Sequence, residues 1–171
     1  MTASLARLLR QSISNEDEVV PLAREVEYAK GYLTIQKMRY KDKLEFEIDV
    51  EPSILNIPLI KLVLQPIIEN AIYHGLKYKE SKGLLQVKGF MKDGNAVLQV
   101  IDNGVGMDEE TLSHIYDKHK VNYHSNGVGV YNVQKRLKLY YGENYGITYE
   151  SEKGVGTTAT IIIPGIQEES I

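Results

Sequence analysis

Between Gln65 and Gly75 the chain reads QPIIENAIYHG, which places a carboxylate and an amide side by side in an otherwise apolar pattern. The pattern has the spacing of a helix that packs on a sheet, with apolar residues at Leu59, Leu62, Val63, Ile67, Ile68, Ala71 and Ile72. We therefore predict one helix over residues 58–75, with Pro58 in its first turn and a kink at Pro66.

Four polar side chains interrupt this pattern at Glu69, Asn70, Tyr73 and His74, and spacings of three and four residues predict that they share one side of the helix. An Asn oxygen can bind a hard cation that bridges substrate phosphates, and an adjacent Glu can orient or deprotonate a hydroxyl or water. These properties are typical of a magnesium–nucleotide site. A helix edge that reaches solvent explains this stretch equally well when it is taken alone.

A second polar group stands at the end of the alternating segment LQVID, which ends in Asp102 and is followed by Asn103, Gly104 and Gly106. A carboxylate at a strand end can accept a hydrogen bond from the exocyclic amine of a base, and Gly106 would let the backbone lie flat against a purine. Asn-Gly is also a strong hairpin signal. The hairpin is disfavoured here because the next residues predict a helix over 108–116, with Asp108 as its N-cap, rather than a strand.

Two further glycine pairs follow. Gly127 and Gly129 open a predicted helix over residues 129–141, where bare backbone amides and the helix dipole attract phosphate. The usual P-loop is excluded because the chain has no Gly-Lys dipeptide, and Asn132 stands where a dinucleotide fingerprint needs its third glycine. The segment KGVGTTATIIIP from Lys153 is by itself only a glycine turn that leads into a strand.

In this order the four segments resemble the GHKL superfamily of ATP-binding domains, which includes sensor histidine kinases, heat-shock chaperone ATPases, gyrase B and mismatch-repair ATPases. The stretch ENAIYHG resembles the N box of that family, and the three glycine segments resemble its glycine boxes. The segments VPLAREVEY, YLTIQKMRY and LQPIIEN are similar to LytS/YesM-type bacterial sensor kinases. The resemblance covers residues 5–164. The aromatic-rich F box of many histidine kinases is reduced here to Ile115-Tyr116, so the contacts of a short lid over residues 117–126 are not predicted.

The resemblance implies an α+β fold, a two-layer sandwich with a mixed sheet, that binds ATP and Mg²⁺. By the same resemblance Asn70 would hold Mg²⁺, Glu69 would be the catalytic carboxylate and Asp102 would receive the adenine amino group. The implied phosphate ligands are Gly127 and Gly129, and the further nucleotide contacts are Tyr73, His74, Gly104, Gly106 and Thr157.

The function implied is that of the catalytic domain of a two-component sensor histidine kinase. It would transfer the γ-phosphoryl group of ATP to a histidine on an upstream dimerisation domain, for later transfer to a response regulator. The resemblance further implies a homodimer and a cytoplasmic domain of a membrane-anchored bacterial protein. His114, His119 and His124 lack the Pro-His-Phe context of the family's phosphoacceptor, so we interpret them as surface or lid residues. The alternative is a GHKL nucleotide-binding module without kinase output.

Composition agrees with a single domain. The chain has 171 residues, of which 43% are hydrophobic and 25% charged, and this suits one domain with a sizeable core. A net charge of −3 provides no basic footprint for nucleic acid, and the lack of cysteine excludes disulfides and thiolate chemistry. No apolar run approaches the ~20 residues of a membrane span, and no signal-peptide pattern opens the chain.

The remaining segments predict how the domain is organised. Residues 1–18, with an amphipathic helix at 4–13, are expected to be a remnant of the dimerisation helix and a linker, and residues 19–171 the ATP-binding domain. Within the domain we predict a helix over 25–40 and a hairpin turn at Asp93-Gly94-Asn95. The predicted strands are residues 44–50, 84–92, 96–102, 146–152 and 157–164.

Overall fold

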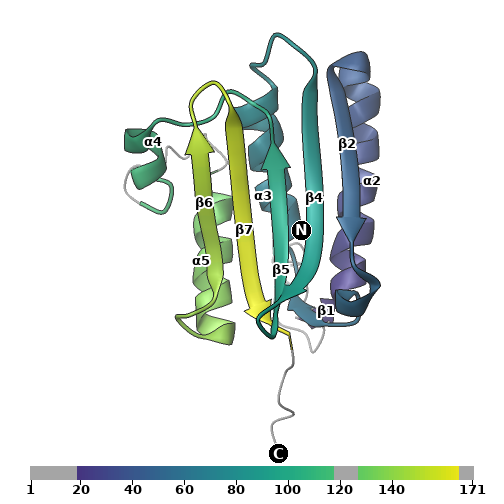
Figure 1. Ribbon diagram of the computed structural model, residues 1–171, viewed down its shortest axis with the longest axis vertical. Helices are drawn as coiled ribbons and strands as arrows, with labels where there is room; N and C mark the ends of the chain where they lie inside the picture. The colour runs from purple at the N-terminus through teal and green to yellow at the C-terminus, as the bar shows by residue number, and fades with distance from the viewer. Residues whose placement is uncertain (1–18, 118–126, 166–171) are drawn as a thin grey trace, which may run out of the picture.

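A mixed five-stranded sheet with helices on one face makes up most of the described part of the molecule (Figure 1). The computed structural model describes residues 19–117 and 127–165. The strands are β2 (Leu44–Val50), β4 (Gly83–Lys92), β5 (Asn95–Asp102), β6 (Gly146–Glu152) and β7 (Gly156–Pro164), in the order β2-β4-β5-β7-β6. The β2–β4 pair is parallel and the other pairs are antiparallel. This confirms the predicted α+β two-layer sandwich.

Helices cover one face of the sheet, and the other face is turned toward the viewer in Figure 1. The longest are α2 (Leu22–Tyr40) and α5 (Gly127–Tyr141), which flank α3 (Leu64–Asn70). A π-helical segment, η3 (Ala71–Leu76), continues α3, and the short α4 (Glu109–Ser113) lies beside the β6 edge. Two 3₁₀ turns, η1 (Lys41–Lys43) and η2 (Pro52–Ile54), flank β2. Among the described residues, no helix combines the length and apolarity that crossing a membrane requires.

Alternation along the strands builds the core between the two layers. In β5, Leu98, Val100 and Asp102 face the helices, and their cross-strand partners in β7 are Ile161, Ala159 and Thr157. The next strand places Ile147 and Tyr149 in the same rows. Because Asp102 follows the apolar alternation, its carboxylate is carried into the interior and is only 5% exposed.

The predicted bounds of most elements are confirmed to within one or two residues at each end. The Asp93-Gly94 turn is confirmed as a two-residue hairpin with positive φ at both residues, 51° and 77°. Asp108 caps α4, since its Oδ1 accepts a hydrogen bond from the Thr111 N–H at 2.8 Å. Helix α2 begins three residues earlier than predicted, and α4 is shorter than predicted. The predicted helix over residues 4–13 lies outside the described residues.

The prediction of one helix over residues 58–75 is wrong at its beginning. Residues Pro58–Ile60 form strand β3, which pairs antiparallel with β1 (Val19–Pro21). The Tyr141 hydroxyl at the end of α5 holds β3 in place, because it donates to the Pro58 carbonyl and accepts from the Ile60 N–H, both at 3.3 Å. Leu62 then adopts a left-handed φ of 59°, which separates the strand from the helix.

The placement of Pro66 inside the helix, on which the predicted kink rested, is wrong for the same reason. Helix α3 begins at Leu64, so Pro66 lies in the first turn, where a backbone N–H has no intrahelical acceptor and proline is tolerated. Proline is therefore compatible with the start of this helix.

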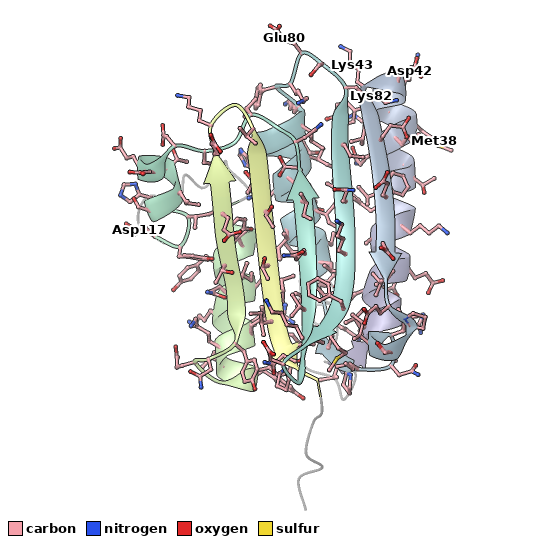
Figure 2. All side chains as sticks on the ribbon, viewed as in Figure 1. Met38, Asp42, Lys43, Glu80, Lys82 and Asp117 are labelled. Carbon is pink, nitrogen blue, oxygen red and sulfur yellow. The ribbon has the colours of Figure 1, made fainter. Side chains whose placement is uncertain are left out.

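The edge of the sheet is held to α2 by ion pairs. Glu45 of β2 accepts from Lys37 of α2 at 2.6 Å and pairs with Lys82, from the segment before β4, at 3.1 Å. Lys82 is labelled in Figure 2, at the same end of the sheet as Asp42 and Lys43. These pairs are exposed, and exposed pairs each contribute little stability, about 0 to 1 kcal/mol. They orient α2 against its neighbouring strand.

Candidate nucleotide-binding site

A pocket lies between the α3–η3 segment and the helix-facing side of the sheet. Its walls come from both layers, with one group from the helix and others from β5, β7 and β6. The lining residues are Ile67, Asn70, Ala71, His74, Gly75, Val100, Asp102, Gly106, Met107, Tyr149, Thr157 and Ala159. The lining is mostly apolar with a few polar groups, as in small-molecule sites.

Asp102 provides a buried acceptor in this pocket. Its Oδ1 accepts the Gly104 N–H at 2.8 Å, and the backbone N–H of Thr157 also bonds to the carboxylate. Burial raises the pKa of Asp102 to about 6, although these two hydrogen bonds and nearby Lys79 lower it. Two N–H donors do not use the full capacity of a carboxylate, which has about four lone-pair sites. Asp102 can therefore accept a further hydrogen bond from a ligand.

Glycines allow the backbone to close around this carboxylate. A Cβ on Gly75 would lie 2.7 Å from the Asp102 Oδ1, and a Cβ on Gly104 would collide with the Gly75 backbone. Gly106 has a φ of 65°, and a Cβ there would collide with the Glu152 carbonyl. The backbone conformation of Gly106 and the close approach of the β6–β7 turn therefore require a glycine here. This requirement does not depend on any contact with a purine. The Val105 N–H donates to the Gly75 carbonyl at 3.1 Å and completes this junction.

The helix divides its four polar side chains between two faces. Asn70 and His74 line the pocket, whereas Glu69 and Tyr73 are not among the lining residues. Glu69 accepts a hydrogen bond from the Gln65 amide at 3.0 Å. Burial is the main cause of the raised pKa of Tyr32, on α2, and Glu69 and Tyr73 raise it further. Both side chains therefore lie toward α2.

The prediction that all four share one side is therefore wrong. Consecutive helix residues point about 100° apart, so the pairs 69/73 and 70/74 occupy neighbouring faces. The π-helical segment that begins at Ala71 widens the turn further, and the Lys77 N–H accordingly bonds to the Ile72 carbonyl at 2.8 Å. Burial, followed by the charge of Lys77, lowers the pKa of His74, which is therefore neutral at pH 7.

A hydroxyl network ties the third glycine segment to the pocket. Ser151 donates to the Gly156 carbonyl at 3.0 Å, accepts the Met107 N–H at 2.8 Å and lies 2.8 Å from the Thr157 hydroxyl. Because the Ser151 proton is directed to Gly156, Thr157 is the donor in the last contact. Lone pairs of Thr157 then remain available to the pocket.

Helix α5 begins at Gly127, so both glycines of the second pair fall in its first turn. A Cβ on Gly129 would lie 3.3 Å from the Cβ of Pro66, which shows that the start of α5 packs against the start of α3. Most of the predicted lid, including His119 and His124, lies outside the described residues. Among the described residues, no group of three or more His, Asp or Glu side chains is arranged to hold a metal. A cation here would need ligands from the nucleotide as well as from Asn70.

Sequence analysis missed Glu25, which positions the helix that carries Asn70. This carboxylate of α2 is 4% exposed and accepts three consecutive backbone N–H groups, from Leu62 at 2.8 Å, Val63 at 3.0 Å and Leu64 at 3.2 Å. Glu25 lies on the neighbouring helix α2, and it provides the acceptor for the free N–H groups at the start of α3. No local signal reveals such a cap, because the donors lie more than 35 residues away.

The fold is a two-layer α/β sandwich with a pocket between its layers, and comparison with protein families shows its class. Residues 56–167 match the family described as "Histidine kinase-, DNA gyrase B-, and HSP90-like ATPase", and residues 1–44 match the family described as "Histidine kinase". The chain belongs to the histidine kinase-, DNA gyrase B- and HSP90-like ATPase family, whose members bind ATP.

Within this family the chain is similar to sensor kinases. It is 32% identical to the sensor histidine kinase YesM of Bacillus subtilis over 164 residues, which is 96% of this chain and 27% of the relative. It is 34% identical to the sensor protein LytS of Oceanobacillus iheyensis over 143 residues, which is 82% of this chain and 24% of the relative. The chain thus spans about a quarter of the length of these curated relatives.

Solved structures share the fold. The catalytic domain of histidine kinase ThkA superposes with a TM-score of 0.66 at 14% identity, over 86% of this chain and 98% of that domain. The histidine kinase domain of a blue-light activated kinase from Erythrobacter litoralis gives a TM-score of 0.61 at 16% identity, over 91% of this chain and 68% of that one.

Proposed function

We propose that this domain binds Mg-ATP in the pocket between α3 and the sheet and supplies the γ-phosphoryl group for phosphorylation of a histidine on a dimerisation domain. The observation that carries this proposal is the buried Asp102 carboxylate, which retains acceptor capacity in an apolar pocket that Asn70 also lines. Adenine offers an amine donor on a flat apolar ring, and the pocket is complementary to both features.

The residues present fit a magnesium–nucleotide complex. Asp102 would accept the exocyclic amine, Thr157 would contact the same edge of the base, and Val100 and Ala159 would pack against the ring. The Asn70 amide oxygen would hold Mg²⁺ together with phosphate oxygens, and the first turn of α5 would present backbone N–H groups to the phosphates. Bound Mg²⁺ neutralises triphosphate charge during phosphoryl transfer. Family membership and the sensor-kinase relatives support this assignment.

We propose that Glu69 acts near the γ-phosphate of ATP rather than near the adenine. Within the described residues the Glu69 carboxylate accepts a hydrogen bond from the partly buried Gln65 amide, a partner that a substrate group could replace. An imidazole arriving near the γ-phosphate would be oriented by this carboxylate. Its catalytic role stays a prediction.

Asn70→Ala tests the cation site. Without the amide oxygen, Mg²⁺ loses its protein ligand, so calorimetry should show Mg-ATP binding weakened by about tenfold or more, or roughly 1.4 kcal/mol, with circular dichroism unchanged. The control is Asn144→Ala, since Asn144 is exposed in the turn between α5 and β6. Unchanged affinity in Asn70→Ala would remove Asn70 from the site.

Radiolabelled ATP tests the kinase output. Positioning supplies much of phosphoryl-transfer catalysis, and no described histidine stands in a phosphoacceptor context. The 171-residue chain should therefore bind ATP but stay unlabelled. A longer protein that includes the upstream histidine helix should gain an acid-labile, base-stable phosphate, which would then pass to a response regulator. ATP binding without labelling of the longer protein would favour a nucleotide-binding module without kinase output.

A further inference from the structure

Tyr149 lies in the floor of the nucleotide pocket although no glycine box or helix motif includes it. In the sheet it pairs with Ala159, which pairs in turn with Val100, so these residues form one row across β6, β7 and β5. All of them line the pocket together with Asn70 and Asp102. The small Ala159 leaves space beside the tyrosine, and the hydroxyl is the polar tip of an otherwise apolar row.

The Tyr149 hydroxyl is buried and lacks a hydrogen-bond partner among the described residues. The Asn70 side chain is near enough to oppose the rise in the hydroxyl pKa, but it does not reach hydrogen-bond geometry, and the hydroxyl proton has no acceptor among the described residues. Buried polar groups in folded proteins nearly always have a partner, and an exception needs an explanation. A ligand in the adjoining pocket would supply one.

The ring of Tyr149 is held in place by its neighbours. Tyr116 packs edge-on against it, with ring centroids 6.1 Å apart and planes at 61°. Tyr116 is itself anchored, because its hydroxyl donates to the Ile147 carbonyl at 2.7 Å. The Tyr149 hydroxyl is thus presented from a supported ring. Burial raises the pKa of Tyr149, so it keeps its proton at neutral pH and can donate.

We propose that the Tyr149 hydroxyl is a nucleobase contact, donating a hydrogen bond to a ring nitrogen of adenine while its lone pair accepts from the Asn70 amide. This inference rests on the proposed ATP-binding function. The two pocket groups are complementary, since Asp102 only accepts and matches the exocyclic amine, whereas Tyr149 donates and matches a ring nitrogen acceptor. By fixing the amide nitrogen of Asn70, the same hydroxyl would direct the amide oxygen toward the cation.

Analogue binding to the wild-type domain provides the first test. Calorimetry would compare ATP with 1-deaza-, 3-deaza- and 7-deaza-ATP, each of which replaces one ring nitrogen by carbon. One analogue should bind about threefold to tenfold more weakly than ATP, since a net hydrogen bond has that value. Equal affinity for ATP and all three analogues would overturn the inference. A wild-type domain that binds no ATP would overturn the proposed function and this inference with it.

Tyr149→Phe provides the second test, with Tyr141→Phe as the matched control. Removal of an unpaired hydroxyl should raise the unfolding midpoint of the free domain, yet weaken ATP binding about threefold to tenfold and abolish the difference between ATP and the sensitive analogue. Tyr141→Phe loses its contacts with Pro58 and Ile60, so it should lower the midpoint and leave the ATP affinity unchanged. A Tyr149→Phe domain that is less stable but binds ATP as the wild type does would show a structural hydroxyl and overturn the inference.

Discussion

Glu25 and Asp102 are both buried carboxylates in the described part of the chain, at 4% and 5% exposure, yet their surroundings differ. Glu25 accepts three backbone N–H groups at the start of α3 and lines a pocket beside β1, apart from the pocket between α3 and the sheet. Asp102 accepts two backbone N–H groups and faces that pocket. Burial alone therefore does not distinguish structure from function. The distinguishing feature is the acceptor capacity that remains on Asp102, since both carboxylates line a pocket.

The largest expected effect is the loss of Glu25. In Glu25→Ala three N–H groups lose their acceptor, two of them buried and one partly buried. A buried donor left unsatisfied costs about 1 to 3 kcal/mol, so urea unfolding should show a loss of about 3 kcal/mol or more. Glu27→Ala, an exposed position on the same helix, should change stability by less than about 0.5 kcal/mol. If Glu25→Ala weakened ATP binding while leaving stability unchanged, the structural role assigned to Glu25 would be contradicted.

The pH dependence of stability tests the environment of Asp102, the second of the two carboxylates. Its pKa is about 6 in the folded state against an ordinary value of 3.8, so between these pH values the folded protein binds more protons than the unfolded chain does. The contribution of Asp102 to stability is therefore fully present at low pH and falls as the pH rises from about 4 to about 6. The loss is about 2 to 3 kcal/mol.

Urea unfolding at a series of pH values would measure this loss as the difference between the wild type and Asp102→Asn, which cancels the titration of other groups. The Asn oxygen can still accept the Gly104 N–H, so the variant should fold. If the difference in unfolding free energy stayed constant between pH 4 and pH 7, the pKa of Asp102 would not be raised by burial.

Features that depend on neighbouring residues in the sequence were predicted more accurately than features that depend on contacts between distant residues. The strands of the five-stranded sheet were predictable because alternation and turn residues are local. Asn70 and Asp102 were proposed as site residues because each interrupts an apolar pattern, and both line the pocket. The segment 58–63 was mispredicted because Pro58, Leu59 and Leu62 suit a helix, while its pairing with β1 joins residues about 40 positions apart. The cap by Glu25 and the place of Tyr149 depend on tertiary packing and on sheet register, neither of which the linear pattern contains.

The smallest expected effect concerns the choice of base and depends on the free acceptor capacity of Asp102. Guanine carries a carbonyl where adenine carries its amine, so GTP would place two acceptors opposite each other in a buried pocket. An unpaired buried polar group costs about 1 to 3 kcal/mol, so ATP should bind at least about fivefold more tightly than GTP in calorimetry. In Asp102→Asn the side chain gains an amide donor that can face the guanine carbonyl, so the preference for ATP should narrow. Equal affinities for ATP and GTP in the wild type would contradict the assigned role, because the remaining lone pairs of Asp102 would then make no contact with the base.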